Sequence, residues 1–447
     1  MTETDSVTRQ LVAAGMSTSA AEAKARLFDR ISSGMPTAGT LRLFVPGRVE
    51  FLGKHTDYAG GKSLVAAIER GICLAAFPRA DRTVVIRDVT RQLTSSFELG
   101  SEIAPLYGTW ASYGVVVGRR IARNFPGTLG GAEIFLASDL SPAAGMSTSS
   151  ALVTGFFHIL SERNTLGRHP AYSTQITSPA SLAEYLGAME NGSSYKALSG
   201  DSGVGTSGGS QDHAAILLSE PRSLLQCGFD PVCKEATIPF PRALAFVIGV
   251  SGVVAEKTGN VQGAYNRISR ATRRMLQRWN LATGRNEATL MAALSRDPEG
   301  HQRLREMIQS DDDPEFDRST LLARLEQVVM ETTVLIPDAV DALRRGDLAA
   351  LGATIEVSQL LAERMLGNQV PETMALARLA RDQGAVAASA FGAGFGGSVY
   401  AVVNEDEAEE FMSRWSAQYM ARFPLRAGNA EFFVTRPGPP LTVLDPA

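Results

Sequence analysis

A serine-rich stretch at residues 142–151, with the sequence PAAGMSTSSA, contains the residue types best suited to phosphate chemistry. The spacing of Leu152, Phe156 and Ile159 predicts a helix directly after it, so the serines would lie at a helix N-terminus. Small residues there let the backbone approach an anion, and the amides, hydroxyls and helix dipole favour a triphosphate. A serine hydroxyl could also ligate Mg²⁺, the ion that neutralises ATP phosphate oxygens. The alternative is a capped helix with a purely structural role.

Two other phosphate-binding patterns are present in part, and their contexts argue against both. The glycines at 392, 394 and 397 have G-x-G-x-x-G spacing, but residues 398–403 continue as a strand, whereas a dinucleotide-binding motif opens a helix. Residues 61–63 end like a Walker A loop, but Thr56 stands where that motif requires its first glycine. The serine-rich stretch is therefore the stronger phosphate-site candidate.

The elements that would position these motifs can be predicted from hydrophobic spacing. Helices are expected at residues 6–33 and 110–124 and over most of 262–360, with a polar break at 311–314. Strands are expected at 41–45, ending at Pro46-Gly47, and at 83–87, 132–137 and 385–403. The longest apolar stretch, 243–255, is interrupted by small polar residues and is too short to span a bilayer. A buried strand is expected there.

Composition narrows the class of protein. A chain of 447 residues predicts two lobes around a cleft. The net charge of −4 does not indicate nucleic-acid binding, although five arginines between 267 and 278 could form a basic helix face. Three cysteines without a C-x-x-C pair fit a reducing compartment, and the polar N-terminus lacks a signal-peptide pattern. A cytoplasmic protein that binds neither membrane nor nucleic acid is expected.

Three segments together carry a family resemblance. Residues 46–61, PGRVEFLGKHTDYAGG, closely resemble the N-terminal signature of galactokinases, in the GHMP kinase superfamily. The serine-rich stretch resembles that family's phosphate-binding motif, and residues 391–398, FGAGFGGS, resemble its third motif. Weaker matches at 110–113, 263–266 and 355–372 keep the family order, so the resemblance runs from about residue 40 to 405.

The resemblance implies an α+β, two-lobed GHMP kinase fold. A helical extension is expected over 1–40, an N-terminal ribosomal S5 domain 2-like lobe over 41–240, and a ferredoxin-like C-terminal lobe over 241–447. ATP and a sugar would bind between the lobes, with Mg²⁺ as cofactor. The protein is expected to be a monomer or a weak homodimer.

The resemblance also implies roles for individual residues. Asp212 matches the catalytic aspartate and Arg48 the catalytic arginine. An arginine beside an aspartate keeps it ionised to accept the hydroxyl proton, and offsets charge on the transferred phosphoryl group. A structural salt bridge is the alternative. The sugar-binding candidates are Lys54, His55, Asp57 and Tyr265, and the nucleotide-binding candidates are Gly145, Ser147, Thr148, Ser149, Ser150, Gly392, Gly394 and Gly396.

The metal site has two alternatives at each ligand. Ser150 matches the last serine of the phosphate loop, with Ser149 as the alternative because the glycine lies one place earlier than usual. Glu190 is the expected carboxylate, although an insertion separates it from Asp212. Glu184 on the same predicted helix is the other candidate.

Three positions depart from the family pattern. Lys54 stands where galactokinases carry a glutamate that the resemblance places near the sugar 6-hydroxyl, so a hexuronic acid such as galacturonate becomes a candidate substrate. Lys54 turned to solvent, with a neutral sugar still bound, is the alternative. Glu50 replaces the usual asparagine, and Ser389 also departs from the pattern; either change could shift sugar or nucleotide preference.

The implied function is ATP-dependent phosphorylation of a monosaccharide at its anomeric hydroxyl, with galactose, a uronic acid or arabinose as acceptor. A heptose or isoprenoid-alcohol kinase is a further possibility within the superfamily. The rival of another class is a catalytically silent sensor that binds sugar and ATP. Retention of Arg48, Asp212 and the serine stretch favours turnover.

Overall fold

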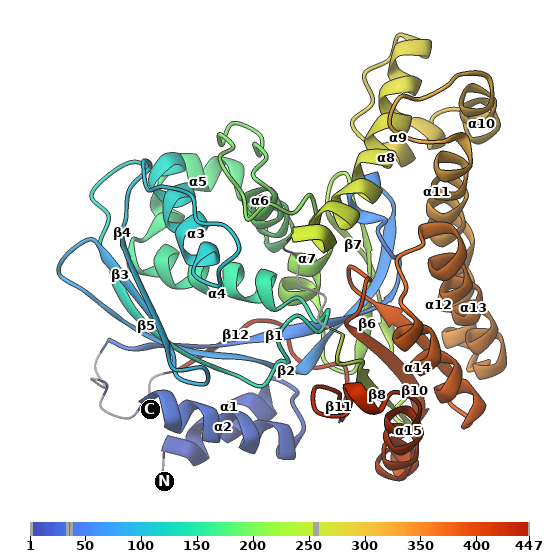
Figure 1. Cartoon of the computed structure of the whole chain (residues 1–447). Coiled ribbons are helices and arrows are strands. Elements are labelled where there is room, and N and C mark those ends of the chain that lie inside the picture. The colour runs from blue at the N-terminus through green and yellow to red at the C-terminus, as the bar shows by residue number, and fades with distance from the viewer. Residues whose placement is uncertain (1–2, 33–34, 36–38, 254–258, 446–447) are drawn as a thin grey trace.

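The computed structural model describes residues 3–32, 35, 39–253 and 259–445. Two sheets, each covered by helices, form the body of the molecule, and a group of long helices extends beside them (Figure 1). The helices α1 (Glu3–Ala13) and α2 (Thr18–Ser32) cover one face of the first sheet. The single helical segment expected at residues 6–33 is thus two helices, because Gly15 adopts a φ of 100° between them.

The first sheet has eight strands, and its path runs β12-β1-β2-β5-β3-β4, with β6 paired to β2 and β7 to β6. Its strands are β1 (Leu41–Leu52), β2 (Lys62–Pro78), β3 (Thr83–Asp88), β4 (Leu93–Glu98), β5 (Ala132–Ser138), β6 (Ser223–Gly228), β7 (Cys233–Pro239) and β12 (Thr442–Leu444). The pairing is antiparallel except between β3 and β5. The strands β1 and β2 pair with each other near the middle of this sheet, and β1 contains Arg48 of the candidate active site.

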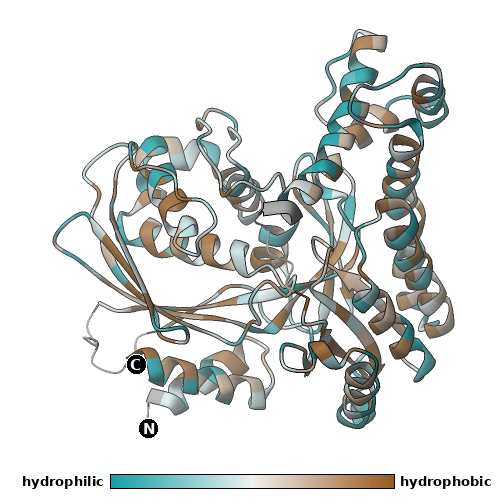
Figure 2. Ribbon diagram, viewed as in Figure 1, coloured by the Kyte–Doolittle hydropathy of each residue, from teal (hydrophilic) through white to brown (hydrophobic). Residues whose placement is uncertain are grey.

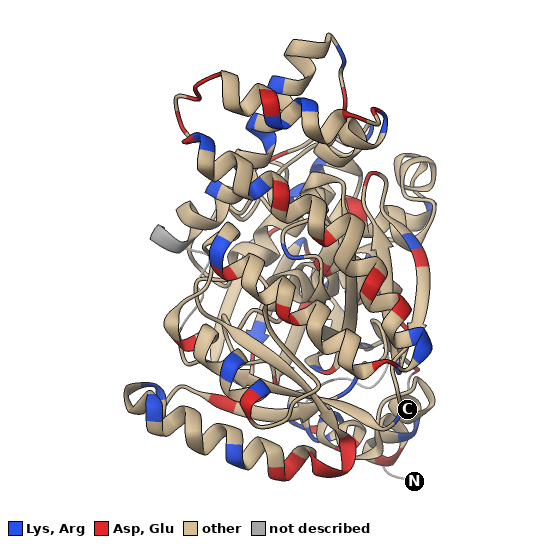
Figure 3. Ribbon diagram, turned by 90° about the vertical axis from the view of Figure 1, so that its right-hand side faces the viewer, with Lys and Arg blue, Asp and Glu red and all other residues tan. Residues whose placement is uncertain are grey.

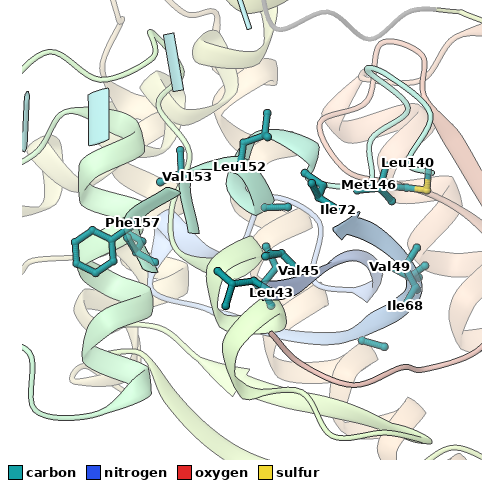
Figure 4. Packing of buried hydrophobic residues seen from close by; sticks show 14 of the residues in the cluster. Leu43, Val45, Val49, Ile68, Ile72, Leu140, Met146, Leu152, Val153 and Phe157 are labelled. Carbon is teal, nitrogen blue, oxygen red and sulfur yellow. The ribbon is translucent and has the colours of Figure 1, made fainter. Parts of the chain in front are cut away.

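Five helices cover the other face of this sheet (Figure 1). They are α3 (Ser112–Asn124), α4 (Thr148–Arg163), α5 (Pro170–Gln175), α6 (Pro179–Asn191) and α7 (Gln211–Leu218). Val153 and Phe157 of α4 belong to the same buried cluster as Leu43 and Val45 of β1 (Figure 4). Figure 2 shows the hydrophobic residues concentrated on the strands and on the helix faces that pack against them.

The second sheet has four antiparallel strands in the order β11-β8-β10-β9. They are β8 (Leu244–Val250), β9 (Ala387–Phe391), β10 (Ser398–Asn404) and β11 (Glu431–Thr435), packed with α14 (Pro371–Asp382) and α15 (Ala408–Arg422). In chain order this is β-α-β-β-α-β, the ferredoxin-like arrangement. The α+β prediction is confirmed. The buried strand expected within 243–255 is β8, with residues 254 and 255 outside the described residues, and the β-character expected around the glycine cluster of 385–403 is that of β9 and β10.

The helices that extend beside the two sheets lie between β8 and α14 in the chain. They are α8 (Gly259–Thr283), α9 (Leu290–Ser295), α10 (Gly300–Ser310), α11 (Arg318–Met330), α12 (Ile336–Arg345) and α13 (Leu348–Leu361), with π-helical segments at Glu331–Leu335 and Ala362–Leu366. The predicted polar break at 311–314 separates α10 from α11. Acidic and basic residues are interspersed along the helices of this side (Figure 3), and within the described ranges no helix is long and apolar enough to cross a membrane.

Four single-turn helices complete the described elements: Asp57–Ala59, Leu166–Arg168, Glu405–Glu407 and Pro424–Arg426. The predicted lobe boundary near residue 240 stays a prediction, and the C-terminal strand β12 pairs with β1 of the first sheet. The strand expected to end at Pro46-Gly47 instead continues to Leu52, because a register shift between Pro46 and Arg48 absorbs the proline within the pairing to β2.

Candidate active site

The serine-rich loop is held against the first sheet by its own apolar residue. Met146 is fully buried and lies in one cluster with Leu140 and Ile72 (Figure 4). Helix α4 begins at Thr148, which confirms the predicted helix N-terminus, and Ser147 before it has a φ of 60°. The buried hydroxyl of Ser147 has no hydrogen-bond partner among the described residues. A ligand oxygen at this helix N-terminus would supply one.

A glycine in β1 allows this loop to approach the strand. A Cβ on Gly47 would lie 2.7 Å from a methyl group of Leu140 and 3.0 Å from the Met146 carbonyl oxygen. The Arg48 amide donates to that carbonyl, with N and O 3.2 Å apart. The Arg48 guanidinium donates to the carbonyl oxygen of Gly145 and, through Nε, to Asp212 Oδ1 at 2.8 Å. The structure therefore brings the predicted catalytic pair together.

Two adjoining pockets meet at this pair. The first pocket is lined on one side by Glu50, His55, Asp57, Tyr58 and Tyr265. The second, larger pocket is lined by residues 142–149 of the serine loop and by Arg91, Trp110 and Tyr113. Both pockets are lined by Arg48, Glu190, Thr206, Asp212 and Ala393. A group bound in one pocket would thus meet a group bound in the other at Asp212.

Three of the four predicted sugar-binding residues lie in the first pocket. His55 is hydrogen-bonded through Nδ1 to the Tyr58 hydroxyl at 2.8 Å, and its ring centroid lies 5.3 Å from that of Tyr265. Asp57 Oδ2 accepts from the Gln211 amide at 3.2 Å. Burial holds the pKa of Asp57 above its usual range. Buried polar groups of this kind suit the recognition of vicinal hydroxyls.

Lys54, the fourth predicted sugar-binding residue, does not line the first pocket in the described part of the chain. It is 1% exposed, and its Nζ donates to Ser358 Oγ at 2.8 Å. That hydroxyl donates in turn to Glu331, whose other carboxylate oxygen accepts from the Gly53 amide at 3.0 Å. Lys54 therefore belongs to a buried polar network. It does not line the sugar pocket, as the uronic-acid hypothesis requires, and it does not turn to solvent, as the alternative expected.

The predicted metal ligands lie side by side. Ser150 Oγ donates to Glu190 Oε2 at 2.7 Å and lies 3.4 Å from Asp212 Oδ2. The buried His213 ring contacts the same Glu190 oxygen through Nε2 at 3.0 Å. The alternative carboxylate, Glu184, instead accepts from the Tyr195 hydroxyl at 3.0 Å and from the Val232 amide at 2.7 Å.

Hard oxygen donors of this kind suit Mg²⁺, which takes few protein ligands and completes its shell with phosphate and water. The described residues contain no cluster of three or more His, Cys, Asp or Glu side chains arranged for a metal ion. A shared Mg²⁺ site made by the Ser150 hydroxyl, the Glu190 carboxylate and a bound nucleotide fits this pair.

The glycine-rich loop packs directly against the serine loop. Gly392 has a φ of 83°, and a Cβ there would lie 2.7 Å from the Gly145 carbonyl oxygen. Gly392 lines the first pocket. Gly394 and Gly396 line neither pocket as described, and a Cβ on either would meet backbone oxygen, that of Asn368 at 2.4 Å or of Val253 at 2.7 Å. These two glycines therefore shape the loop, and a nucleotide contact by them stays a prediction.

Several residues of the site were not among the predicted site residues. Glu50 was predicted only as a departure that could shift sugar or nucleotide preference, and Tyr58 had no predicted role. Both lie within residues 46–61, after the point where the strand was expected to end. Had β1 been extended through Pro46-Gly47, the alternation of side chains would have placed Glu50 on the same face as Arg48. Thr206 and Gln211 come from the loop before α7 and from its first residue, where the sequence carried no separate signal.

Comparisons with known proteins indicate the family of this chain. Residues 37–78 match the family model described as the galactokinase galactose-binding signature, and residues 339–421 match GHMP kinases C terminal. A galactokinase of Roseiflexus sp. (strain RS-1) is 27% identical over 379 residues, 82% of this chain and 84% of that protein. A galactokinase of Haemophilus influenzae is 24% identical over 387 residues, 86% of this chain and 90% of that protein.

Solved structures support the same fold. The crystal structure of Lactococcus lactis galactokinase complexed with galactose superposes with a TM-score of 0.75 at 21% identity, covering 94% of this chain and 99% of that one. The mevalonate kinase of Methanococcus jannaschii gives a TM-score of 0.56 at 12% identity, covering 90% and 99%. Two family models match segments of this chain, and curated galactokinases align along about four-fifths of it, so this chain is a galactokinase-like member of the GHMP kinase superfamily.

Proposed function

We propose that this protein transfers the γ-phosphoryl group of ATP to the anomeric hydroxyl of a monosaccharide, with galactose as the first candidate acceptor. The observation that carries the proposal is the position of the Arg48–Asp212 pair where the two pockets meet. In this assignment the sugar occupies the first pocket and the triphosphate lies along the serine loop in the second. Curated galactokinases align with most of the chain, which supports this choice of acceptor and donor.

The chemistry needs alignment, charge neutralisation and a place for one proton. The anomeric oxygen forms a bond to the γ-phosphorus, the bond between that phosphorus and the β,γ-bridging oxygen breaks, and ADP leaves. Asp212 accepts the hydroxyl proton. The Arg48 guanidinium favours the ionised form of Asp212 and offsets negative charge on the phosphoryl oxygens, while His55 and Asp57 hold the sugar hydroxyls. Mg²⁺, held by Ser150 and Glu190, would neutralise charge on the phosphates.

A coupled assay of ADP release tests the proposal. The wild-type protein, assayed with ATP and Mg²⁺, should release ADP with at least one of galactose, galacturonate, arabinose and fucose, and the product should be the sugar 1-phosphate by NMR. Mevalonate serves as the control acceptor from elsewhere in the superfamily and should give no turnover. If every sugar leaves the rate at background while ATP still binds, the silent sensor replaces the kinase.

The uronic-acid alternative has lost the feature that suggested it. An ammonium group that pairs with a substrate carboxylate must reach the pocket, whereas the Lys54 amine is hydrogen-bonded to Ser358. The carboxyl groups of Asp57 and Asp212 line the first pocket instead. Like charges close together in a pocket select against an anionic sugar. A neutral monosaccharide is therefore the better-supported acceptor.

A Lys54→Met substitution is expected to lower the free energy of unfolding by about 3 kcal/mol, because it removes a charge partner from a buried network. The Glu331 carboxylate in that network is fully buried and would lose the nearby ammonium group. Urea denaturation measures the change. Lys62→Met is the matched control, since its partly exposed amine pairs with Glu235 at 2.9 Å and should cost less than about 1 kcal/mol. A Lys54 variant that is fully stable but shifts the preference between galactose and galacturonate would instead place Lys54 at the sugar.

The remaining expectations stay proposals. Cys73 and Cys227 are buried and unpaired, and Cys233 is exposed and unpaired, which fits a reducing, cytoplasmic setting. The proposed state of the protein is a monomer or weak homodimer.

A further inference from the structure

Glu50 is placed in the first pocket by the geometry of β1. Side chains alternate along a strand, so Arg48 and Glu50 lie on the same face, and the pairing of this stretch with β2 is regular from Arg48 to Glu50. Both residues line the first pocket, and Glu50 is 3% exposed. The carboxyl group is thus buried beside the proposed catalytic arginine, at the sugar side of the site.

One oxygen of this carboxyl group lacks a hydrogen-bond partner from the described residues, as does the side-chain nitrogen of Gln211 in the same pocket. Glu50 Oε1 is buried and makes no hydrogen bond to any residue that the structure describes. Arg48, His55 and Asp57 in the same pocket are each hydrogen-bonded to the protein. A buried polar atom without a partner is costly, and such atoms in native proteins usually meet water or a ligand. Because Glu50 lines the first pocket, a molecule bound there could supply the missing hydrogen-bond partner.

The charge state of Glu50 suits a neutral partner. Burial raises the pKa of Glu50 to about 8, with Asp212 and Glu331 adding to the shift and Arg48 and Lys54 opposing it. Near neutral pH the carboxyl group therefore carries a proton in the free protein. In that form it can both donate and accept, which matches the two hydrogen-bonding capacities of a sugar hydroxyl.

We propose that Glu50 is a specificity-determining residue that hydrogen-bonds one non-anomeric hydroxyl of a neutral sugar acceptor. The proposal rests on the proposed function and deepens it, because it names a neutral monosaccharide as the substrate class and a residue that distinguishes its hydroxyl pattern. A sugar without that hydroxyl would leave the buried carboxyl group unpaired. Sites built around a substrate hydroxyl reject analogues that lack it.

The test pairs Glu50 variants with a series of deoxygalactoses that lack the 2-, 3-, 4- or 6-hydroxyl in turn. The wild-type protein should lose about 10- to 100-fold in kcat/KM at the hydroxyl that Glu50 contacts. In Glu50→Met, which has a similar length and no hydrogen-bonding group, galactose and that deoxygalactose should be used within about twofold of each other, because the lost partner no longer matters. Glu50→Gln is the matched control, since its amide still donates and accepts and should retain most of the discrimination.

Each outcome of the experiment decides the proposal. If Glu50→Met discriminates against all four deoxygalactoses as strongly as the wild type, Glu50 contacts none of these hydroxyls and the proposal is wrong. If Glu50→Met does not fold, as judged by circular dichroism, Glu50→Asn carries the same comparison, because its shorter side chain withdraws the polar group from the contact. Unchanged discrimination in that variant is equally decisive.

Failure of the proposed function gives a different result. A wild-type protein that releases no ADP but binds galactose in calorimetry is not a kinase, and the same series of sugars and variants is then compared by dissociation constant. If removing one hydroxyl weakens sugar binding to the wild type but not to Glu50→Met, the contact between Glu50 and that hydroxyl would still be supported. A wild-type protein that binds no sugar of the series overturns both proposals.

Discussion

An Asp212→Asn variant is expected to lose about 10³-fold in kcat while keeping its fold, because a carboxamide cannot take up the proton of the acceptor hydroxyl. The substitution preserves size, and the amide oxygen can still accept from Arg48 Nε, now 2.8 Å from the carboxylate. The Asp212 side chain is 17% exposed, at the opening shared by the two pockets. Steady-state ADP release with galactose measures the loss, and thermal unfolding by circular dichroism confirms the fold.

A second arginine–aspartate pair in the same protein supplies the control. Asp201 pairs with Arg119 at 2.8 Å, and its side chain is more buried than that of Asp212, at 9% exposure. Asp201 lines neither of the two pockets as described. Asp201→Asn should therefore change stability without changing kcat by more than about twofold. Equal losses of turnover in Asp201→Asn and Asp212→Asn would reduce the Arg48–Asp212 pair to a structural salt bridge.

Replacing Arg48 by alanine is expected to reduce kcat by roughly 10³-fold and to raise KM for ATP, because this side chain serves both pockets. Its guanidinium donates to Asp212 and to the Gly145 carbonyl in the serine loop. Arg48→Lys keeps the positive charge but lacks the planar guanidinium that donates to two acceptors at once, so it should recover only part of the lost rate. Initial rates over a matrix of ATP and sugar concentrations separate the effects on kcat and KM.

The double variant shows whether the two residues act as one unit. If Arg48 acts mainly through Asp212, the combination of Arg48→Ala and Asp212→Asn should be little slower than the slower single variant. Losses that multiply would mean that Arg48 and Asp212 contribute independently. A rise in KM for ATP in Arg48→Ala, absent from Asp212→Asn, would separately support the contact between Arg48 and the serine loop. Arg48→Ala with wild-type kinetics would contradict the assignment.

The sequence predicts a site residue well when the residues that position it are close to it in the chain, and poorly when they are distant. The serine loop was predictable because a helix N-terminus is encoded by neighbouring residues, and α4 begins where the spacing of apolar residues placed it. The choice between Glu184 and Glu190 was not predictable in this way. The two glutamates are six residues apart, about one and two-thirds turns of α6, so they project in different directions. The face that points at Ser150 is set by the packing of α6.

The strand β1 shows why part of the site escaped the sequence. Pro46-Gly47 is a common turn signal, and the prediction ended the strand there. In the folded protein the pairing with β2 continues beyond a local irregularity, since the backbone hydrogen bonds of a long neighbouring strand outweigh the local preference. The residues after this irregularity, among them Glu50, therefore have side chains that alternate between the two faces of the sheet.

Residue types and short spacings were enough to indicate the superfamily, the order of the motifs and the catalytic candidates Arg48 and Asp212. Which side chains of residues 46–61 face the pocket depends on the folded chain. Lys54 is drawn to Ser358, 304 residues later in the chain, whereas Glu50 is left facing the pocket. A buried charged group is stable only beside a partner, and the partner of Lys54 comes from a distant segment whose proximity no local sequence pattern records.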